Sequence, residues 1–389
     1  MKRKVGIVTF HAAWNYGAVL QCTALSKKLE MMGYDVSVID YQPKYAEENI
    51  VRNPIQEARK LYRELGGTPI SYRVYRSLRR AIRCIWDIKD VRKRIEKRKS
   101  FEDFREKYLR LTDPYQTEES LYKELPEFDV YVTGSDQLWN ASITNDMLDP
   151  VYFLSFAKEN KKKIAYAVSA CNIKKRDEQQ LRCLLKGLDR LSIREDKNKE
   201  LLQALSGQEV AVCPDPTLLI PVQTYEAMEE PIAQAKPYGL IYLLAKDEAK
   251  VQCEVLAQKL QHDLGIQMVD ASPNKFCKIE GLQKLDGVSP GAWLRLIHNA
   301  EYVLTNSFHC MIFASLYHKD CFILPCASDR MERLTEFAKN SGLEDRIVYT
   351  TEQINNSIYN KTDYSRFEEF KSRATQRAEE FLAMSIADI

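Results

Sequence analysis

The sequence predicts an α/β fold built from two parallel-sheet halves with a cleft between them. The first observation is a strand–helix–strand pattern at the start of the chain, with an apolar run over 5–10, helical spacing over 17–32 and a second apolar run over 36–39. Such a unit forms a parallel sheet that is buried on both faces. The second observation is that this rhythm resumes after Pro126 and again after a proline-rich stretch at 214–221. A chain of 389 residues is also long for one core and suits two domains.

Short apolar runs that alternate with helical spans predict the remaining strands. They cover 129–133, 163–169, 190–194 and 210–213 in the first half, and 239–244, 266–269, 302–305 and 321–324 in the second. A final helix is expected over about 364–384. The predicted plan is an N-terminal domain over 1–215, a C-terminal domain over 216–350, and a C-terminal segment over 351–389 that packs back across the domains.

A strongly basic insert interrupts the first half. Residues 52–110 contain 19 Lys and Arg against 8 Asp and Glu, although the net charge of the chain is only +2. One predicted helix, over about 74–86, has an apolar stripe with arginines on the other side, and a more charged helix is expected over 90–109. The insert is either a hairpin that packs on the first domain or a surface that contacts an anionic membrane. Nucleic-acid binding is not favoured, because the aromatic residues follow the apolar stripe.

The composition excludes several classes of protein. A hydrophobic fraction of 45% and a charged fraction of 29% are those of a soluble globular protein, and no apolar run is long enough to span a bilayer. The ten cysteines include no Cys-x-x-Cys pair, so neither a disulfide framework nor a zinc site is expected. The apolar part of the N-terminus is too short for a secretory signal. We therefore expect a cytoplasmic protein with no bound metal.

Polar groups follow the predicted strands at four places, where the ligands of open α/β sheets bind. The first is the loop that contains Asn15 and Gly17, after the opening strand. Gly17 lets the backbone approach a ligand, and the helix N-terminus attracts an anion. A plain strand-to-helix turn has the same pattern. Asp40, at the end of the second strand, resembles a ribose-binding acid but is weak evidence alone.

The second loop runs from Gly134 through Asn140, directly after an apolar strand. Asp136 is a candidate to orient or deprotonate a sugar hydroxyl, and Trp139 is a candidate to stack on a sugar face. Ser135 and Asn140 complete this candidate acceptor site. Ser and Asp are also favoured helix caps, so a structural role is equally consistent with the pattern.

The third and fourth loops contain Arg194 and His309. Arg194 closes a buried strand, where an arginine is costly unless an anion or a neighbouring acid meets it. His309 follows Ser307 at the start of a helix, a position that favours anions and proton transfer near neutral pH. A structural histidine would occupy such a position as well.

Six segments carry a resemblance to a known family. They are VGIVTFHAAWNYGAVLQCTAL, YVTGSDQLWN, KIAYAVS, LSIRE, PDPTLLI and YVLTNSFHCMIFASLYHK, in this order over about 4–330. On these motifs the chain resembles the polysaccharide pyruvyl transferase family. It departs from the family pattern at Cys310, where a glycine commonly follows Ser-Phe-His. We expect this cysteine to make the start of the helix bulkier there.

The resemblance implies two Rossmann-like domains, similar to the GT-B glycosyltransferases, and phosphoenolpyruvate as the donor. The product would be a ketal between pyruvate and two hydroxyls of one sugar residue. By motif, Arg194 would bind the carboxylate or phosphate of the donor, His309 would supply or relay a proton, and Asp136 would act on a sugar hydroxyl. Ser307, Asn15 and Gly17 complete the implied donor site.

The expected partners are phosphoenolpyruvate and a sugar acceptor that is a lipid-linked oligosaccharide, met at the inner face of the plasma membrane. No cofactor is expected, since arginine and helix N-termini can neutralise the charge of the donor. Two alternatives stay open. The first is a nucleotide-sugar glycosyltransferase of the same fold, although no acidic pair in the C-terminal half suits a ribose. The second is a non-catalytic component of a polysaccharide assembly complex.

Overall fold

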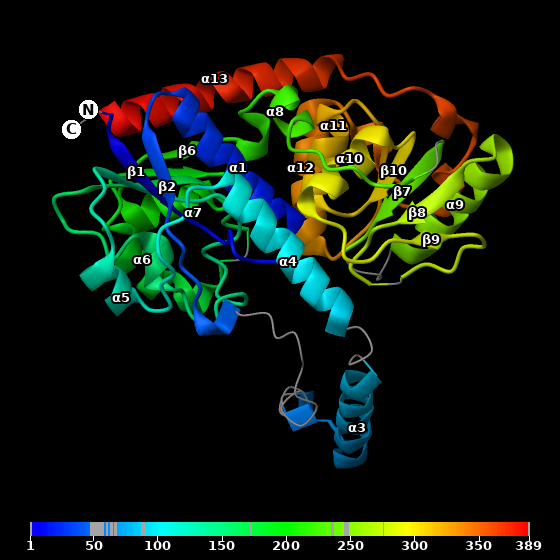
Figure 1. Cartoon of the computed structure of the whole chain (residues 1–389), viewed down its shortest axis with the longest axis horizontal. Coiled ribbons are helices and arrows are strands. Elements are labelled where there is room, and N and C mark those ends of the chain that lie inside the picture. Colours follow the sequence, from blue (N-terminus) through cyan, green and yellow to red (C-terminus); the bar gives the residue numbers. More distant parts are fainter. Residues whose placement is uncertain are drawn as a thin grey trace.

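Two parallel β-sheets, each flanked by helices, stand side by side in the computed structural model (Figure 1). The structure describes residues 2–46, 58–59, 61–62, 65, 68–86, 91–171, 173–234, 237–244, 249–274 and 276–387. Part of the predicted basic insert therefore lies outside the described residues. The predicted α/β class with two Rossmann-like halves is confirmed.

The first sheet has six parallel strands in the order β2-β1-β3-β4-β5-β6. The strands are β1 (Lys4–Val8), β2 (Asp35–Val38), β3 (Val130–Thr133), β4 (Lys162–Val168), β5 (Arg190–Ile193) and β6 (Val210–Val212). Val5 of β1 lies opposite Val36 of β2 and Val130 of β3. Helices cover both faces of the sheet, so these strands are apolar almost without interruption.

The second sheet has five strands in the order β11-β10-β7-β8-β9. They are β7 (Tyr238–Tyr242), β8 (Gln267–Asp270), β9 (Gln283–Lys284), β10 (Tyr302–Thr305) and β11 (Asp320–Ile323). Every strand predicted for this half is present. The edge strand β9 is two residues long, too short to leave a periodic signal in the sequence.

The strand order reverses once in each sheet. The reversal lies between β1 and β3 in the first sheet and between β7 and β10 in the second. Ligands of open α/β sheets bind beyond the carboxyl ends of strands at such reversals. The segments that follow β1, β3 and β10 lie at these two points, and they include Gly17, Asp136 and His309.

Helices follow most of the strands, and further helices form the basic insert and the C-terminal part of the chain. They are α1 (Tyr16–Met31), α3 (Ile70–Trp86), α4 (Val91–Tyr108), α5 (Glu118–Glu124), α6 (Glu178–Leu185), α7 (Lys199–Ser206), α8 (Val222–Glu226), α9 (Ala249–Leu264), α10 (Pro290–Asn299), α11 (Phe308–Leu316), α12 (Ser328–Ser341) and α13 (Ser365–Ala387). Single 3₁₀ turns lie at Lys44–Ala46, Pro150–Phe153, Lys175–Asp177, Pro216–Leu218, Glu344–Arg346, Thr351–Gln353 and Asn356–Tyr359.

Helix α1 joins the two halves through a shared core. Its buried residues, such as Val19 and Leu20, belong to one apolar cluster with residues of the second half. Tyr16 stacks on Trp293 with ring centroids 4.8 Å apart, and its hydroxyl donates to the Val288 carbonyl at 2.7 Å. The helix ends at Met31, and Gly33 just beyond it adopts a φ of +96°, a left-handed conformation that commonly closes helices. The core-like packing fixes the two sheets relative to each other.

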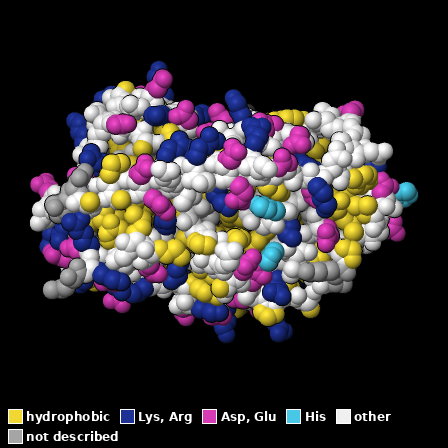
Figure 2. Space-filling view, turned by 90° about the horizontal axis from the view of Figure 1, so that it is seen from above, with side chains coloured by type: hydrophobic (Ala, Val, Ile, Leu, Met, Phe, Trp, Pro, Cys, Tyr) yellow, Lys and Arg dark blue, Asp and Glu magenta, His cyan; other side chains and the backbone are white. Residues whose placement is uncertain are grey.

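Helix α13 crosses from the second half back to the first (Figure 1). Phe367, near its start, is buried in the core of the second half, whereas Ala378 and Leu382 are buried against the first sheet. Midway along the helix, Thr375 donates to the Leu218 carbonyl at 3.2 Å. The outer face of the molecule here carries mixed basic, acidic and apolar side chains (Figure 2). Helix α13 therefore straps the two halves together.

The two helices of the basic insert differ in their packing. Helix α4 buries Phe101 and Phe104 in the core shared by both halves, and its Lys93 pairs with Asp286 at 2.9 Å. Helix α3 projects away from both sheets (Figure 1). Its apolar stripe, including Leu78 and Ile82, is exposed. The stripe of α3 does not pack on the first domain, which was one of the two predicted arrangements. Within the described part of the chain, no helix has the length and apolar character needed to cross a membrane.

Candidate active site

One carboxylate oxygen joins the two residues predicted to bind the donor. Asp215 Oδ2 lies 2.7 Å from Nη1 of Arg194 and 3.3 Å from Nε2 of His309. Arg194 follows β5 in the first sheet, Asp215 follows β6, and His309 begins α11 after β10 in the second sheet. The structure therefore brings Arg194 and His309 together across the interface of the two halves.

Asp215 was not predicted as a site residue. Its signal in the sequence is an acid placed directly after an apolar strand, within the segment PDPTLLI. Its side chain is 1% exposed, and Thr217 donates to Oδ1 through its backbone N–H at 3.0 Å and its hydroxyl at 2.7 Å. Burial opposes ionisation, but the charges of His309 and Arg194 hold the pKa of Asp215 below its usual range. The residue is a buried, permanently charged acceptor.

Arg194 is buried with one of its nitrogens unsatisfied. The side chain is 2% exposed, and its Nε lies 2.9 Å from Glu195 Oε1. The guanidinium carbon lies 4.7 Å from the centroid of the Phe308 ring. Burial alone would lower the pKa of Arg194, but the charges of Glu195 and Asp215 raise it above its ordinary value. Nη2 has no hydrogen-bond partner among the described residues. Leaving such a donor unpaired costs about 1–3 kcal/mol, which an anionic ligand would recover.

The start of α11 places His309 against α1. Ser307 caps the helix by accepting from the Cys310 N–H at 3.4 Å. A β-carbon added at Gly17 would lie 2.0 Å from Nδ1 of His309, so the imidazole lies directly against the first turn of α1. Two helix N-termini, from different halves, thus meet at one histidine. Cys310, which replaces the glycine common in the family, is fully buried in the core.

Substituting Gly17 should disable the site without unfolding the protein. The β-carbon of Gly17→Ala would overlap the His309 ring at 2.0 Å, so the imidazole must move away from Asp215. We expect activity to fall by at least about 10²-fold, because misplacing a catalytic group by 1 Å has effects of this size. Gly187→Ala is the matched control, since its β-carbon meets only the Leu184 carbonyl at 3.6 Å. Equal activities of the two variants would contradict the placement of His309.

Asp136 lies near the same cluster. The residue adopts a φ of +81°, and its negative charge contributes to the raised pKa of Arg194, after burial and the nearer acids. Its Oδ1 accepts from the Gln137 N–H at 2.8 Å, and its carbonyl accepts from the Ser169 N–H at 2.9 Å. A non-glycine residue held in this left-handed conformation indicates a constrained position for the carboxylate.

Three other residues of this loop do not face a ligand. Trp139 is 1% exposed, stacks on Phe153 with centroids 5.1 Å apart, and donates its indole N–H to the Tyr152 carbonyl at 3.3 Å. Its predicted role as a sugar platform is therefore wrong for this structure, because the loop turns the ring into the core. The buried Ser135 hydroxyl donates to the Ala167 carbonyl at 2.8 Å, and the Asn140 side chain donates to Gln137 at 3.1 Å. Both side chains thus have partners within the protein, and their predicted acceptor-binding role stays a prediction.

Asn15 is exposed and directly precedes α1. Its Oδ1 accepts from the Ala18 N–H at 3.3 Å, which makes it the N-cap of α1. The cap leaves the N–H groups of the first turn of α1 beside Gly17 and His309, where an anion would meet them.

His11 and Asp40 form a buried pair of their own. Nε2 of His11 lies 2.8 Å from Asp40 Oδ1, and Nδ1 lies 3.1 Å from the Thr9 carbonyl. Both ring nitrogens therefore have a hydrogen-bond partner in the core. Burial opposes ionisation of Asp40, but hydrogen bonds from His11 and Gln42 lower its pKa below the ordinary carboxyl value. The carboxylate of Asp40 is therefore already occupied by hydrogen bonds to His11 and Gln42, which does not suit a ribose-binding role.

The Asp40→Ala variant should lose stability in a pH-dependent way. Removing one partner of a buried pair costs about 3–5 kcal/mol, so urea unfolding at pH 7 should show a loss of this size. The pKa of Asp40 is depressed in the folded state, so its stabilising effect is complete above the ordinary carboxyl pKa and disappears as the pH falls through the folded value. The difference between parent and variant should shrink below about pH 4. A difference that stays constant from pH 7 to pH 3 would contradict the pairing.

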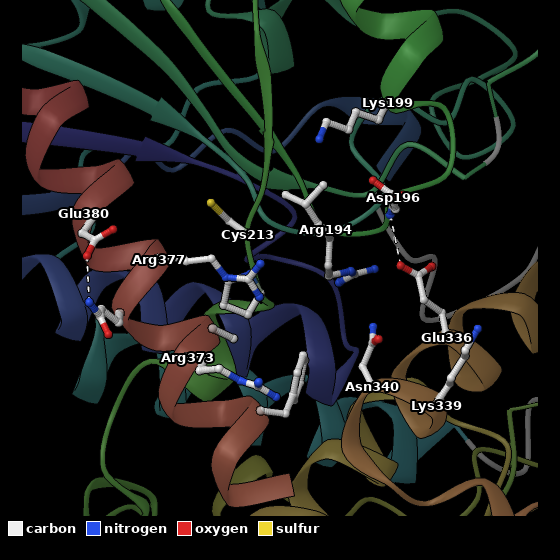
Figure 3. A pocket seen from close by; sticks show the side chains of 15 residues that line it. Arg194, Asp196, Lys199, Cys213, Glu336, Lys339, Asn340, Arg373, Arg377 and Glu380 are labelled. Atoms are coloured by element: carbon white, nitrogen blue, oxygen red, sulfur yellow. Dashed lines mark hydrogen bonds between the residues drawn. The ribbon is translucent and has the colours of Figure 1, made fainter. Parts of the chain in front are cut away.

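A pocket of about 950 Å³ opens beside Arg194 (Figure 3). Its walls come from the ends of β5 and β6 and from helices α7, α12 and α13. A smaller cavity of about 50 Å³, lined by Asp215 and Phe308 among others, adjoins the same arginine. Arg194 therefore stands between the Asp215–His309 cluster and a large open pocket. Among the described residues, no group of His, Cys, Asp and Glu is arranged to hold a metal ion.

A family model decides the relationship of this chain to known proteins. The model for polysaccharide pyruvyl transferase matches residues 15–328, which is most of the chain. The chain belongs to the polysaccharide pyruvyl transferase family. The matched range of this pyruvyl transferase family member includes Arg194, Asp215 and His309, whereas α13 lies beyond it. No curated protein matches the sequence.

Solved structures resemble this member of the polysaccharide pyruvyl transferase family at the level of the fold. The UDP-GlcNAc 2-epimerase of Methanocaldococcus jannaschii has a TM-score of 0.54 at 13% identity, with 98% of this chain and 99% of that chain covered. Arabidopsis thaliana UGT89C1 complexed with UDP-L-rhamnose has a TM-score of 0.53 at 10% identity, covering 100% and 99%. The UDP-N-acetylglucosamine 2-epimerase of Rickettsia bellii has a TM-score of 0.52 at 10% identity, covering 100% and 97%. These matches confirm a GT-B-like fold.

Proposed function

We propose that the protein transfers a pyruvyl group from phosphoenolpyruvate to two hydroxyls of one sugar, forming a ketal during polysaccharide assembly. The observation that carries this proposal is the meeting of Arg194, Asp215 and His309 across the two halves, with a buried Arg194 nitrogen that has no hydrogen-bond partner among the described residues. Membership of the pyruvyl transferase family supports the class of reaction.

The donor carries a carboxylate and a phosphate, and the site offers groups for both. Nη2 of Arg194, beside Phe308, has no hydrogen-bond partner among the described residues, and an arginine fork suits either anion. The N-termini of α1 and α11 meet at His309, which adds unpaired backbone N–H groups. Together they would hold phosphoenolpyruvate at the interface of the halves.

His309 is the proposed proton carrier. Its Nε2 faces the charged Asp215 and its Nδ1 lies against Gly17, so the ring is oriented by both neighbours. The imidazolium would protonate the vinyl carbon of the donor, which becomes a methyl group and leaves an oxocarbenium-like centre. A first sugar hydroxyl then adds to that centre, phosphate leaves, and a second hydroxyl closes the ketal. One hydroxyl proton restores the histidine and the other leaves with phosphate.

Asp136 is the proposed group on the acceptor side. Its constrained carboxylate contributes to the raised pKa of Arg194, which supports a place for it in the same site. A carboxylate there would accept a proton from an attacking hydroxyl.

The test is to incubate the purified protein with phosphoenolpyruvate and lipid-linked sugars, and to follow phosphate release and product mass together. The expected result is one phosphate released for each sugar that gains a pyruvyl ketal. Phosphate release without a ketal, or neither, across a broad acceptor panel would overturn the proposal. The fold also suits glycosyl transfer from a nucleotide sugar, as in the plant protein complexed with UDP-L-rhamnose, and turnover of UDP-sugars without phosphoenolpyruvate would support that candidate instead.

The exposed stripe of α3 suits contact with an anionic membrane, where a lipid-linked acceptor would be met. Val74, Leu78 and Ile82 are exposed on this helix, and so are Arg76 and Arg79. Apolar burial plus about 1 kcal/mol for each basic residue near the surface gives such helices membrane affinity. The protein should float with vesicles that contain anionic lipid and dissociate at high salt.

The Leu78→Glu variant should lose most of this vesicle binding, because it places a charge in the stripe. Val251→Glu, at an equally exposed apolar position on α9, is the matched control and should bind like the parent. Binding that is indifferent to lipid charge and to salt would contradict the electrostatic contact.

A further inference from the structure

The large pocket beside Arg194 is unusually rich in basic side chains (Figure 3). Five of its lining residues are basic: Arg194, Lys199 of α7, Lys339 of α12, and Arg373 and Arg377 of α13. Three are acidic: Asp196, Glu336 and Glu380. The excess of positive charge is gathered in one hollow of about 950 Å³. Such an arrangement attracts an anion.

Four of these basic residues have no ion-pair partner among the residues that the structure describes. Among the described residues, none of Lys199, Lys339, Arg373 and Arg377 forms an ion pair, although ion pairs are frequent elsewhere on the surface. The acids of the pocket are engaged in other contacts: Glu336 accepts from the Asp196 N–H at 3.1 Å, and Glu380 accepts from Gln376 at 2.9 Å. Burial also raises the pKa of Glu336 above the ordinary carboxyl value. Within the described part of the chain, these four basic groups therefore have no ion-pair partner.

Arg373 and Arg377 are one helical turn apart and both line the pocket from α13 (Figure 3). Residues at this spacing lie on the same face of a helix, so their two forks can hold one ligand. Arg194 also lines the pocket, and its buried Nη2 has no hydrogen-bond partner in the described part of the chain. Basic residues therefore reach the pocket both from α13 and from the end of β5.

The size of the pocket indicates more than one anionic group. Pockets that bury a whole drug-sized ligand measure about 300–1,000 Å³, and this one is at the upper end of that range. A three-carbon donor bound by Arg194 and His309 would leave the basic groups of α13 without a ligand. A phosphorylated acceptor would fill that space and still present its sugar toward Arg194.

We propose that the α13 end of this pocket binds the diphosphate group of an activated sugar acceptor. The inference rests on the proposed pyruvyl transfer and names the class of acceptor that the site takes. Arg373 and Arg377 clamp the diphosphate bidentately, Lys339 and Lys199 neutralise the remaining charge, and the sugar extends toward the Arg194–His309 cluster. Helix α13 thereby serves as part of the acceptor site as well as a strap between the halves.

The binding test uses inorganic pyrophosphate as the probe, measured by titration calorimetry at low salt. The parent should bind it, and the Kd should rise about tenfold or more for Arg377→Gln and further for the double variant with Arg373→Gln. Arg366→Gln is the matched control, since this α13 arginine lies outside the pocket and pairs with Glu344 at 3.6 Å. Should the glutamine variants fail to melt cooperatively, Arg373→Lys and Arg377→Lys keep the charge, lose the fork and should weaken binding severalfold.

No pyrophosphate binding by the parent, or an unchanged Kd in the folded double variant, would overturn the proposal. This result is independent of catalysis. A protein that binds pyrophosphate through Arg373 and Arg377 but does not turn over phosphoenolpyruvate retains the site and loses only the proposed reaction.

Kinetics then distinguish the acceptor from the donor. The Arg373→Gln/Arg377→Gln variant should raise the KM for a diphosphate-linked sugar about tenfold or more and leave the KM for phosphoenolpyruvate unchanged. A rise confined to the KM for phosphoenolpyruvate would place the donor in the pocket and overturn the assignment. A competition experiment distinguishes the two possible sources of the diphosphate. If UDP displaces bound pyrophosphate, the acceptor is a nucleotide-linked sugar. If farnesyl diphosphate displaces it, the acceptor is a lipid-linked sugar.

Discussion

His309→Asn should lower the turnover number by about 10²- to 10⁴-fold, the range typical of a lost general acid–base group. The asparagine keeps much of the shape of the imidazole, and its side chain can still fill the space between Gly17 and Asp215. It cannot exchange a proton near neutral pH. The KM for phosphoenolpyruvate should change little, because Arg194 and the helix N-termini remain in place. Steady-state phosphate release, with the fold checked by a thermal melt, measures both quantities.

The matched control for this variant is His298→Asn. His298 also pairs with an acid, at 2.6 Å from Glu229, and stacks on Tyr317 with centroids 4.5 Å apart, but it lies at the end of α10 away from the cluster. The control should therefore turn over donor like the parent. Parent-like turnover by His309→Asn itself would make the histidine structural and the proposed proton transfer wrong.

Asp215→Asn should be the most damaging substitution in the cluster, since it affects stability and activity together. It removes the negative charge that lies between the Arg194 guanidinium and His309, at 2.7 and 3.3 Å. Breaking a buried charged pair from one side costs about 3–5 kcal/mol, because the remaining charge stays buried without compensation. We also expect both a raised KM for phosphoenolpyruvate and a lowered turnover number, because Asp215 positions the two residues that perform these roles.

A buried acid of the second sheet separates the two effects. Asp270 ends β8, its side chain is 1% exposed, and it lies 3.4 Å from Lys284, so Asp270→Asn should also lower the free energy of unfolding. It touches none of the cluster residues and should leave kcat and KM near the parent values at a temperature where it is folded. If the two variants lost activity in parallel with stability, the role assigned to Asp215 would be only structural.

Ten of the eleven strands that the structure describes could be predicted from the amino-acid sequence. Parallel strands that are buried on both faces must be apolar throughout, so β1, β5 and β10 are visible as short runs without any structural information. The ends of those strands then indicate the site, because an arginine such as Arg194 is too costly at a buried position to lack a partner. Helical periodicity likewise predicted α13 and the two insert helices.

Which polar groups meet depends on how the folded chain packs. Asp215 and Trp139 both follow apolar segments, yet they have different environments. Asp215 lies at the centre of the cluster, whereas the indole of Trp139 packs on Phe153. Spacing along the chain does not determine which way a loop turns its side chains, because that depends on packing against residues far away in sequence. The basic pocket depends on the same kind of information. Arg194 and Arg377 share it only because α13 returns from the second half to pack on the first sheet, and burial of Ala378, Leu382 and Ile386 there is what stabilises that return.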